Sequence, residues 1–473
     1  MDNEKRLLLA FILSFFILFF FQKNFKPSAS QTQESVVTNS ISQPVTQKPV
    51  LLQQAINTQE YKTDQYTITY TPTGGYITNI IYNKFNDNLH FTNILRTPEY
   101  DNILFSIKEL NNSLIFISTD NDKKIEKRIV FNNDNTITCS IGSYEQTDLY
   151  LVAQQLDPNK ANARYQEFFY KGEKWEHKNN SKLKTSFEVN KKTSSGLRGR
   201  YYAAILIDVD PLQVFKNKEN LTLVQKTRNA EFTMYLGPQT KKDLELVGMQ
   251  DIINFGLFDP IAGLLLAIIG FFFSIFKNWG ISIILLSITV YITCFPLTAK
   301  STKSMKKMQE IQPQLEVLKE KYKDNPQRFQ KETMELYREY NVNPMSGCFP
   351  IFLQMPVFIS LYQILYRLVD LKGANFLWIS DLSKPDYLIT FPINLPIIGN
   401  GLHLLPILMA ALTFAQQKMT TPKAQMTEQQ KNMIIIMPAI LLVIFYSFPS
   451  GLVLYWMTNS ILTTSYQYFL KRK

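Results

Sequence analysis

The chain has 473 residues, enough for two or three folding units, and a formal net charge of +11 at pH 7. A basic balance of this size suits binding to nucleic acid, to an anionic membrane or to a ribosome. The sequence has no zinc-ligand spacing and no RNA-binding signature, so the last two classes are favoured. The three cysteines, Cys139, Cys294 and Cys348, are far apart, which argues against a disulfide framework.

The first predicted element is an apolar run at residues 7–21, which only Ser14 interrupts. Two basic residues precede it, so we expect an N-terminal membrane anchor over residues 1–22 with its amino end in the cytoplasm. The alternative is a cleaved signal peptide, for which residues 28–30 (Ser-Ala-Ser) offer a small-residue cleavage site. Residues 23–60 are rich in Gln, Ser, Thr and Pro and predict a flexible linker.

Residues 61–248 predict a soluble β domain. Tyr66, Ile68 and Tyr70 alternate with threonines, and Gly74-Gly75 indicates a turn before the next apolar run. Further runs of this kind are found at residues 76–82, 113–119, 128–131, 201–209 and 232–236. Short alternating strands separated by Gly, Asn and Asp are typical of a sandwich.

Six apolar runs follow residue 258, and Arg367 is the only charged residue within them. We expect helices at or across a membrane over residues 261–276, 281–297, 349–369, 402–417, 433–448 and 451–470.

The segment at residues 298–346 contains ten Lys and Arg residues, which predicts that it stays in the cytoplasm. Four of them form a basic patch directly after an apolar run: Lys300, Lys303, Lys306 and Lys307. A chain that leaves the cytoplasm through the anchor crosses back only once before this patch. We therefore expect 281–297 to span and an interfacial helix at 251–276 to lie at the outer surface. The alternation predicts six spans, both termini in the cytoplasm and residues 61–248 in the periplasm.

Residues 299–341 show two apolar stripes of helical period on either side of Asn325-Pro326, which predicts a cytoplasmic helical hairpin. Its basic surface would bind lipid headgroups or ribosomal RNA. The alternative is a face that is merely solvated, because charge runs usually mean only that.

The predicted spans also carry many hydroxyl and amide side chains. A polar groove open to lipid would lower the cost of moving polar peptide through hydrocarbon without ATP. Alternatively, each hydroxyl bonds to its own helix backbone or joins neighbouring helices, which is common in membranes. The density of polar residues in the last span favours a groove for the set as a whole. The candidate groove residues are Ser287, Tyr291, Gln354, Tyr455, Trp456 and Asn459.

Five stretches in the second half of the chain resemble the signature of the YidC insertases. They are residues 278–280 (NWG), 296–298 (PLT), 343–356 (NPMSGCFPIFLQMP), 377–379 (LWI) and 448–452 (FPSGL). The preceding anchor and β domain are similar to those of Gram-negative members, which have a large periplasmic domain.

The resemblance implies an insertase core over residues 249–473, with five helices around a hydrophilic groove open to the cytoplasm and to lipid. It implies a periplasmic all-β supersandwich. The implied function is to move nascent hydrophobic segments into the bacterial inner membrane, alone or with the Sec translocon. The ribosome and membrane lipids are further implied partners, and no small-molecule substrate, cofactor, metal or covalent chemistry is expected.

One departure from the family concerns charge. Tyr291 stands where the family has its single groove arginine, so attraction to acidic client tails does not carry over to this chain. Arg367 stands where the family has no such charge, and we expect its side chain to reach the outer interface.

Two other classes of function compete with this interpretation. A secondary transporter would predict internal repeats and ionisable residues near mid-membrane, and the sequence has neither. An envelope enzyme would need a catalytic constellation in the β domain. His90 and His177 are far apart there, and no Ser/His/Asp or metal-ligand spacing appears.

Overall fold

The computed structural model describes residues 57–472 except for 121–122, 158–162, 164, 181–182, 184–185, 254, 256–257, 343–348, 396–398 and 421–427. The chain forms two compact units, which meet in sequence between Ile253 and Asn254. The predicted anchor at 1–22, nearly all of the linker at 23–60 and the first half of the motif at 343–356 lie outside the described residues.

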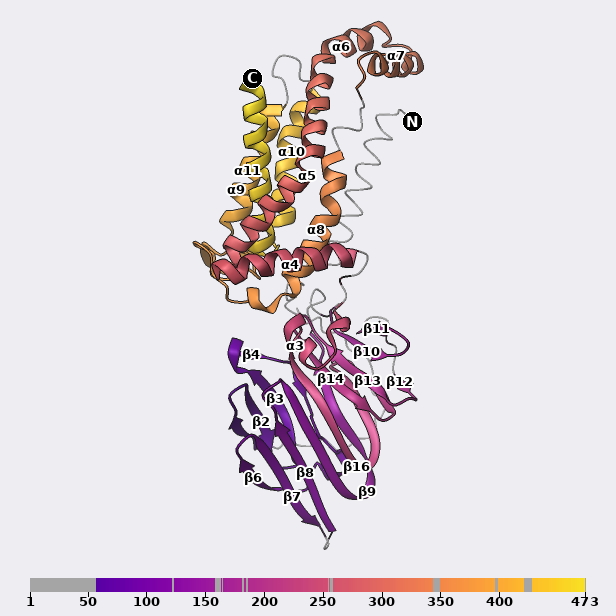
Figure 1. Cartoon of the computed structure of the whole chain (residues 1–473), viewed down its shortest axis with the longest axis vertical. Helices are drawn as coiled ribbons and strands as arrows, with labels where there is room; N and C mark the ends of the chain where they lie inside the picture. The colour runs from indigo at the N-terminus through magenta and orange to yellow at the C-terminus, as the bar shows by residue number, and fades with distance from the viewer. Residues whose placement is uncertain are drawn as a thin grey trace, which may run out of the picture. The chain divides into compact units, whose positions relative to one another are not determined.

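The first unit is an antiparallel β structure (Figure 1). Its strands are β1 Gln59–Lys62, β2 Tyr66–Thr71, β3 Tyr76–Tyr82, β4 Asp87–Asn88, β5 Phe91–Thr92, β6 Ser106–Leu110, β7 Ser113–Asp120, β8 Lys123–Phe131, β9 Thr136–Gln155, β10 Glu167–Lys171, β11 Trp175–Asn179, β12 Ser186–Val189, β13 Thr193–Arg198, β14 Tyr202–Val209, β15 Leu212–Lys216 and β16 Asn220–Pro238. A four-stranded sheet has the order β1-β2-β3-β4. A twelve-stranded sheet runs β11-β10-β13-β14-β16-β9-β8-β7-β6, with β15, β12 and β5 attached to its middle.

The two sheets pack face to face through the alternation that the sequence predicts. Tyr66, Ile68 and Tyr70 of β2 are buried, whereas the threonines between them are partly exposed. The Tyr66 hydroxyl donates to the carbonyl oxygen of Leu236 at 2.6 Å, and the Tyr70 ring meets the Phe116 ring edge-on at 5.6 Å. The prediction of a sandwich-like all-β domain is therefore confirmed.

The predicted turn at Gly74-Gly75 joins β2 to β3 and has positive φ at both residues, +86° and +58°. A Cβ atom on Gly75 would lie 2.9 Å from the Phe105 ring. Glycine is needed here for both reasons, because side-chain-bearing residues avoid this conformation and no space is left for a methyl group.

A short segment after β16 closes the first unit. Helix α3, Lys241–Leu246, and the 3-10 turn at Gln250–Ile252 place Leu244, Met249 and Ile252 against buried side chains of the large sheet. The Arg198 guanidinium donates to the Ile252 carbonyl oxygen at 2.7 Å. The compact unit thus extends to Ile253, five residues beyond the boundary expected at 248.

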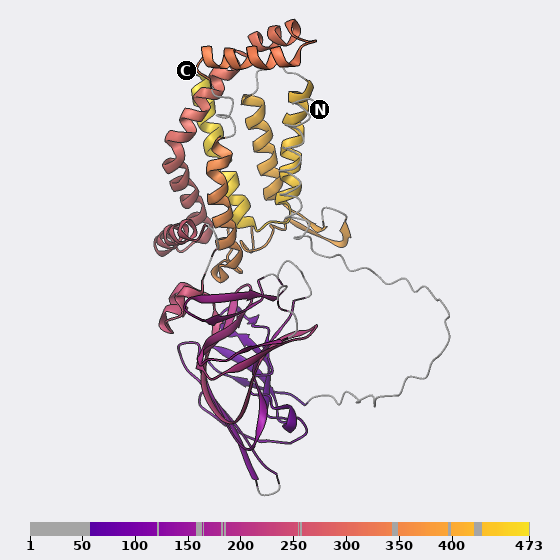
Figure 2. The same cartoon turned by 90° about the vertical axis from the view of Figure 1, so that its right-hand side faces the viewer.

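The second unit is helical. Its elements are α4 Asp259–Phe276, α5 Trp279–Glu310, α6 Gln312–Lys321, α7 Pro326–Glu339, α8 Phe349–Arg367, β17 Ile389–Leu395, β18 Gly399–Leu402, α9 Leu404–Thr420, α10 Glu428–Phe445 and α11 Ser450–Arg472. Helices α5, α8, α9, α10 and α11 run side by side, whereas α4 lies across one end of them and α6 and α7 lie at the other end (Figures 1 and 2). A helical C-terminal region is therefore confirmed.

Two of the described helices are long and apolar enough to cross a membrane by the criteria of length and composition, and they are Asp259–Phe276 and the part of α5 over Trp279–Met308. Helix α5 continues without interruption through the basic patch to Glu310. This differs from the expected hairpin over 299–341, because the two hairpin helices begin only at Gln312. Asn325 caps α7 as its sequence suggests, accepting a hydrogen bond from the backbone N–H of Arg328 at 3.1 Å.

The loop between α8 and α9 holds the first residues of α11. The backbone N–H of Ser450 donates to the Lys384 carbonyl oxygen at 2.8 Å, and that of Gly451 donates to the Leu382 carbonyl oxygen at 3.0 Å. These donors have no partner within a helix, so the loop satisfies two of the exposed N–H groups of the α11 terminus. The hairpin of β17 and β18 belongs to this same loop, and the sequence analysis did not predict it.

Candidate functional site

The candidate site lies where α5, α8 and α11 meet. Helix α11 packs closely along α5 and α9, and α8 touches both α5 and α11 while packing mainly on α4. Polar side chains from all three helices gather at this junction within otherwise apolar segments.

Gln354, Tyr455 and Asn459 form the centre of this cluster. The Gln354 side-chain amide donates to the Tyr455 hydroxyl across the helix interface at 2.5 Å. The Asn459 amide donates to the Tyr455 carbonyl oxygen at 3.2 Å, one turn along the same helix. Tyr455 is buried, whereas Gln354 and Asn459 remain partly exposed. The structure therefore brings together three of the predicted groove residues and leaves two amides accessible at the edge of the cluster.

Tyr291 extends the cluster along α5. Its hydroxyl is 3.4 Å from the Leu462 carbonyl oxygen of α11, and its ring lies 6.0 Å from that of Phe295. Phe295 in turn meets Tyr466 edge-on at 4.9 Å. Tyr291 thus faces the stretch of α11 that follows Asn459, and it is only partly buried.

Trp456 and Ser287 make their contacts away from this cluster. The Trp456 ring packs on Phe358 and Phe445 at 5.5 and 5.2 Å, which is an apolar contact with α8 and α10. Because adjacent helix residues point about 100° apart, Trp456 leaves the face that carries Tyr455. Ser287 has no exposed surface, and its hydroxyl donates to the Ile283 carbonyl oxygen at 2.8 Å. Its polar group is satisfied by its own helix, which is the alternative that the sequence left open.

Arg367 lies in the last turn of α8, and its guanidinium is 5.9 Å from the centre of the Phe255 ring. This places the charge at the α4 end of the bundle, away from Gln354 and Tyr455, which is consistent with the expected position at the outer interface.

All four residues of the basic patch, Lys300, Lys303, Lys306 and Lys307, are exposed. They belong to the last turns of α5, at the end of the bundle opposite α4 (Figure 1). Because α5 is one helix, these charges are held rigidly next to the apolar segment.

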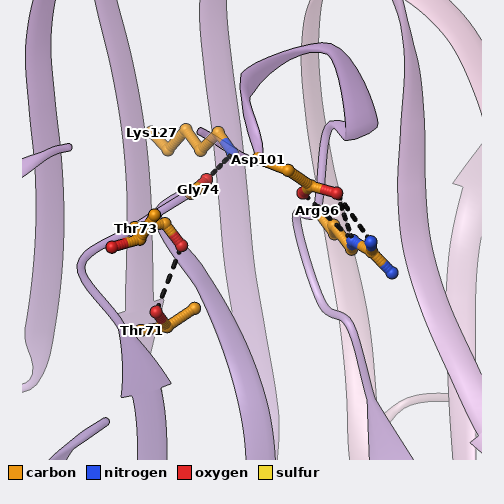
Figure 3. A network of polar contacts seen from close by, with 6 residues as sticks. All are labelled: Thr71, Thr73, Gly74, Arg96, Asp101 and Lys127. Carbon is orange, nitrogen blue, oxygen red and sulfur yellow. Dashed lines mark hydrogen bonds and ion pairs between the residues drawn. The ribbon is translucent and has the colours of Figure 1, made fainter. Parts of the chain in front are cut away.

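The first unit contains a second polar cluster, around Lys127 of β8 (Figure 3). The Lys127 amine donates to the carbonyl oxygens of Gly74 and Leu95 at 2.7 and 2.9 Å. Beside it, Arg96 and Asp101 form an ion pair at 2.6 Å. Burial lowers the pKa of Lys127 from 10.5 to about 7, while the Asp101 charge acts in the opposite direction.

A lysine with a lowered pKa has the chemistry of a nucleophile or base, but the Lys127 side chain has no exposed surface. No substrate can reach its amine in this structure, so its role is to join β8 to the turn at Gly74 and the loop at Leu95. His177 is likewise engaged by its neighbour, with Nδ1 2.8 Å from the Glu167 carboxylate. Among the described residues, no group of three or more His, Cys, Asp and Glu is placed to hold a metal ion.

Comparison with known proteins identifies the helical unit. A family model described as 60Kd inner membrane protein matches residues 271–473. A protein named membrane protein insertase YidC from Syntrophobacter fumaroxidans is 40% identical over 266 residues, and one from Lawsonia intracellularis is 32% identical over 336 residues. Residues 271–473 match the family of 60Kd inner membrane proteins, and the chain is similar to proteins named YidC. The resemblance seen in the sequence motifs is thereby confirmed, and the alternative of a transporter finds no support among these relatives.

The matches to YidC proteins cover part of each chain. The alignment with the Syntrophobacter protein includes 56% of this chain and 46% of the relative, and that with the Lawsonia protein includes 63% and 60%. This chain thus spans about half the length of the curated relatives that it matches. A crystal structure of an active YidC insertase with its first transmembrane domain resolved is 19% identical, with a TM-score of 0.46, and covers 88% of this chain and 93% of that chain.

Proposed function

We propose that this protein is a membrane protein insertase that passes nascent hydrophobic segments into the bacterial inner membrane. The observation that carries the proposal is the partly exposed polar cluster between α5, α8 and α11. It consists of Tyr291, Gln354, Tyr455 and Asn459.

The cluster addresses the main energetic barrier to insertion. A single Asp, Lys or Arg at the centre of a bilayer costs about 2.5–3.5 kcal/mol, and each unpaired backbone group adds several more. The amides of Gln354 and Asn459 offer both donors and acceptors at the edge of the cluster. A client segment that passes them can exchange hydrogen bonds with water for hydrogen bonds with the protein, and the barrier falls without ATP.

The proposal includes a topology with six spans and both termini in the cytoplasm. The first span is the predicted anchor, the next is the apolar part of α5, and α8 to α11 supply the rest. Helix α4 runs across the ends of the other helices (Figure 1), which supports its assignment as an interfacial helix at the outer surface. The β unit is then periplasmic, and α6, α7 and the basic patch are cytoplasmic.

The proposed partners follow from these surfaces. The exposed lysines of the patch suit the anionic headgroups of the inner leaflet and the phosphates of ribosomal RNA. The Sec translocon is proposed as a further partner because the signature motifs are those of the YidC family.

Site-specific photocrosslinking tests the proposed path. A photoreactive residue replaces Tyr291 or Asn459, and a ribosome-bound client is stalled during insertion into inner-membrane vesicles. We expect crosslinks to the client from both positions. The matched controls are Ser287, which is buried on α5, and Ile435, which is exposed on α10 away from the cluster. Equal crosslinking at all four positions, or none at Tyr291 and Asn459, would show that this junction is not the path.

A further inference from the structure

The loop between α8 and α9 contains an exposed apolar turn, the tip, at residues 376–379. The proposed client path does not use it. Phe376 and Ile379 exchange two backbone hydrogen bonds of 2.9 Å, so that Leu377 and Trp378 form a two-residue turn. The exposed fraction is 76% for Leu377 and 37% for Trp378. The tip therefore presents a large aliphatic and a large aromatic side chain on the surface.

The tip is held in place by packed neighbours. Ile379 is buried, and the Trp378 indole N–H donates to Asp386 at 3.3 Å. Asp386 is itself buried and accepts from the backbone N–H of Leu405 at 2.8 Å, which fixes it to the start of α9. The exposure of Leu377 is thus a property of a rigid turn.

The backbone of the tip is also strained. Leu377 has φ of +53°, a left-handed conformation in which the Cβ of an ordinary residue approaches the following carbonyl oxygen. Gly or Asn would relieve this strain and would remove an apolar side chain from the surface. A leucine in such a position fits a site where its side chain leaves water.

The tip adjoins the corner between α4 and α5. A Cβ atom on Gly280 would lie 2.1 Å from the Phe376 ring, so this ring rests on the backbone of the first turn of α5. One turn earlier, Ile275 and Phe276 at the end of α4 are exposed. The tip and the apolar end of α4 therefore lie on either side of this contact.

We propose that the Leu377-Trp378 tip inserts into the lipid–water interface of the outer leaflet beside the end of α4. The inference rests on the proposed function, in which α4 lies at that interface. Residues 373–380 carry no charge, so nothing in the tip opposes transfer from water into the interface. Tryptophan prefers this region, where its ring contacts acyl chains while its N–H keeps a polar partner. Here Asp386 provides that partner.

Spin-label accessibility of the full-length protein tests this proposal. Leu377 is replaced by cysteine in a chain whose native cysteines are serines, labelled with a nitroxide and reconstituted into vesicles of phosphatidylethanolamine and phosphatidylglycerol. The matched controls are Asn375→Cys and Ser380→Cys, which are exposed in the same loop. We expect the ratio of collisions with oxygen to collisions with a water-soluble nickel complex to be severalfold higher at 377 than at either control.

Two results would overturn the proposal. A label at 377 that meets the nickel complex as often as the controls lies in water. A label that is shielded from both reagents is buried against protein, either the β unit or a second copy of the chain. Insertion of a client by the same vesicles keeps the two proposals separate. Lipid contact at 377 without insertion contradicts the insertase function alone, and insertion with a water-exposed 377 contradicts the tip anchor alone.

Discussion

Replacing Lys127 by methionine should change how the stability of the β unit depends on pH. In the folded protein the pKa of this lysine is about 7, because burial disfavours its charged form, whereas in the unfolded chain it returns to about 10.5. Between these two values the unfolded state binds more protons, so the wild-type free energy of unfolding should rise as the pH rises. The shift corresponds to a total of about 5 kcal/mol at roughly 1.4 kcal/mol per unit.

Experiments can reach the part of this change between pH 6 and pH 9, where the wild-type free energy of unfolding should rise by about 3 kcal/mol from Lys127 alone. The Lys127→Met variant loses this gain. It also leaves the carbonyls of Gly74 and Leu95 without a donor, at a cost of about 1–3 kcal/mol that does not depend on pH. The variant should therefore be clearly less stable than the wild type at pH 9, and the gap should close toward pH 6.

Urea unfolding of a fragment spanning residues 57–253 measures this directly, since those residues form one compact unit. Trp175 is the single tryptophan in that range and packs against Phe169 at 5.7 Å, so its fluorescence reports the folded core. Lys124→Met is the matched control, because Lys124 is an exposed lysine on the same strand. Parallel pH profiles for wild type and Lys127→Met would refute the reasoning. They would mean that the two carbonyls and the Phe105 ring, 5.1 Å away, keep the amine charged.

Three further predictions concern the membrane part and its boundary. In a protein without native cysteines, a cysteine introduced at Lys319 should resist an impermeant thiol reagent in intact cells, whereas one at Asn112 should react. Labelling at Lys319 would contradict the proposed topology. Replacing Tyr291 with arginine should favour clients with acidic translocated tails by roughly fivefold, because an ion pair is worth about 1 kcal/mol even in water; unchanged insertion of all clients would exclude it from the path. A protein that lacks residues 61–253 should retain client insertion. Deleting only 61–240 should give an unstable protein, because Leu244, Met249 and Ile252 lose the sheet on which they pack. Equal abundance of the two proteins would contradict this boundary.

The β unit shows how far the sequence could predict the fold. Alternation located β2, β3, β7 and β14, because a strand with one buried face has a period of two. It did not predict β9, which has 20 residues and changes its register with β16 twice. One irregularity skips Leu151 of β9 and the other skips residues 143–146, so no single period describes the whole strand.

The candidate site shows a different limit. The sequence indicated which polar residue types the helices carry, and four of the six candidates meet at one junction. It could not tell that Ser287 and Trp456 point elsewhere. Within a helix a serine hydroxyl can be satisfied by the preceding turn, and the direction of a tryptophan depends on how neighbouring helices are rotated. Only the packing of α11 between α5, α8 and α9 decides these questions.

The loop between α8 and α9 contacts the first residues of α11 and so fixes where that helix begins. With a rise of 1.5 Å per residue, Tyr455 lies about 7.5 Å from Ser450, Asn459 about 13.5 Å and Leu462 about 18 Å. The distance of each of these groups from the loop contact is therefore fixed by its position along α11. A change at Leu382 or Lys384 that moves the start of α11 should displace Tyr455, Asn459 and Leu462 together. A longer or shorter carboxyl end of α11 should leave these residues in place.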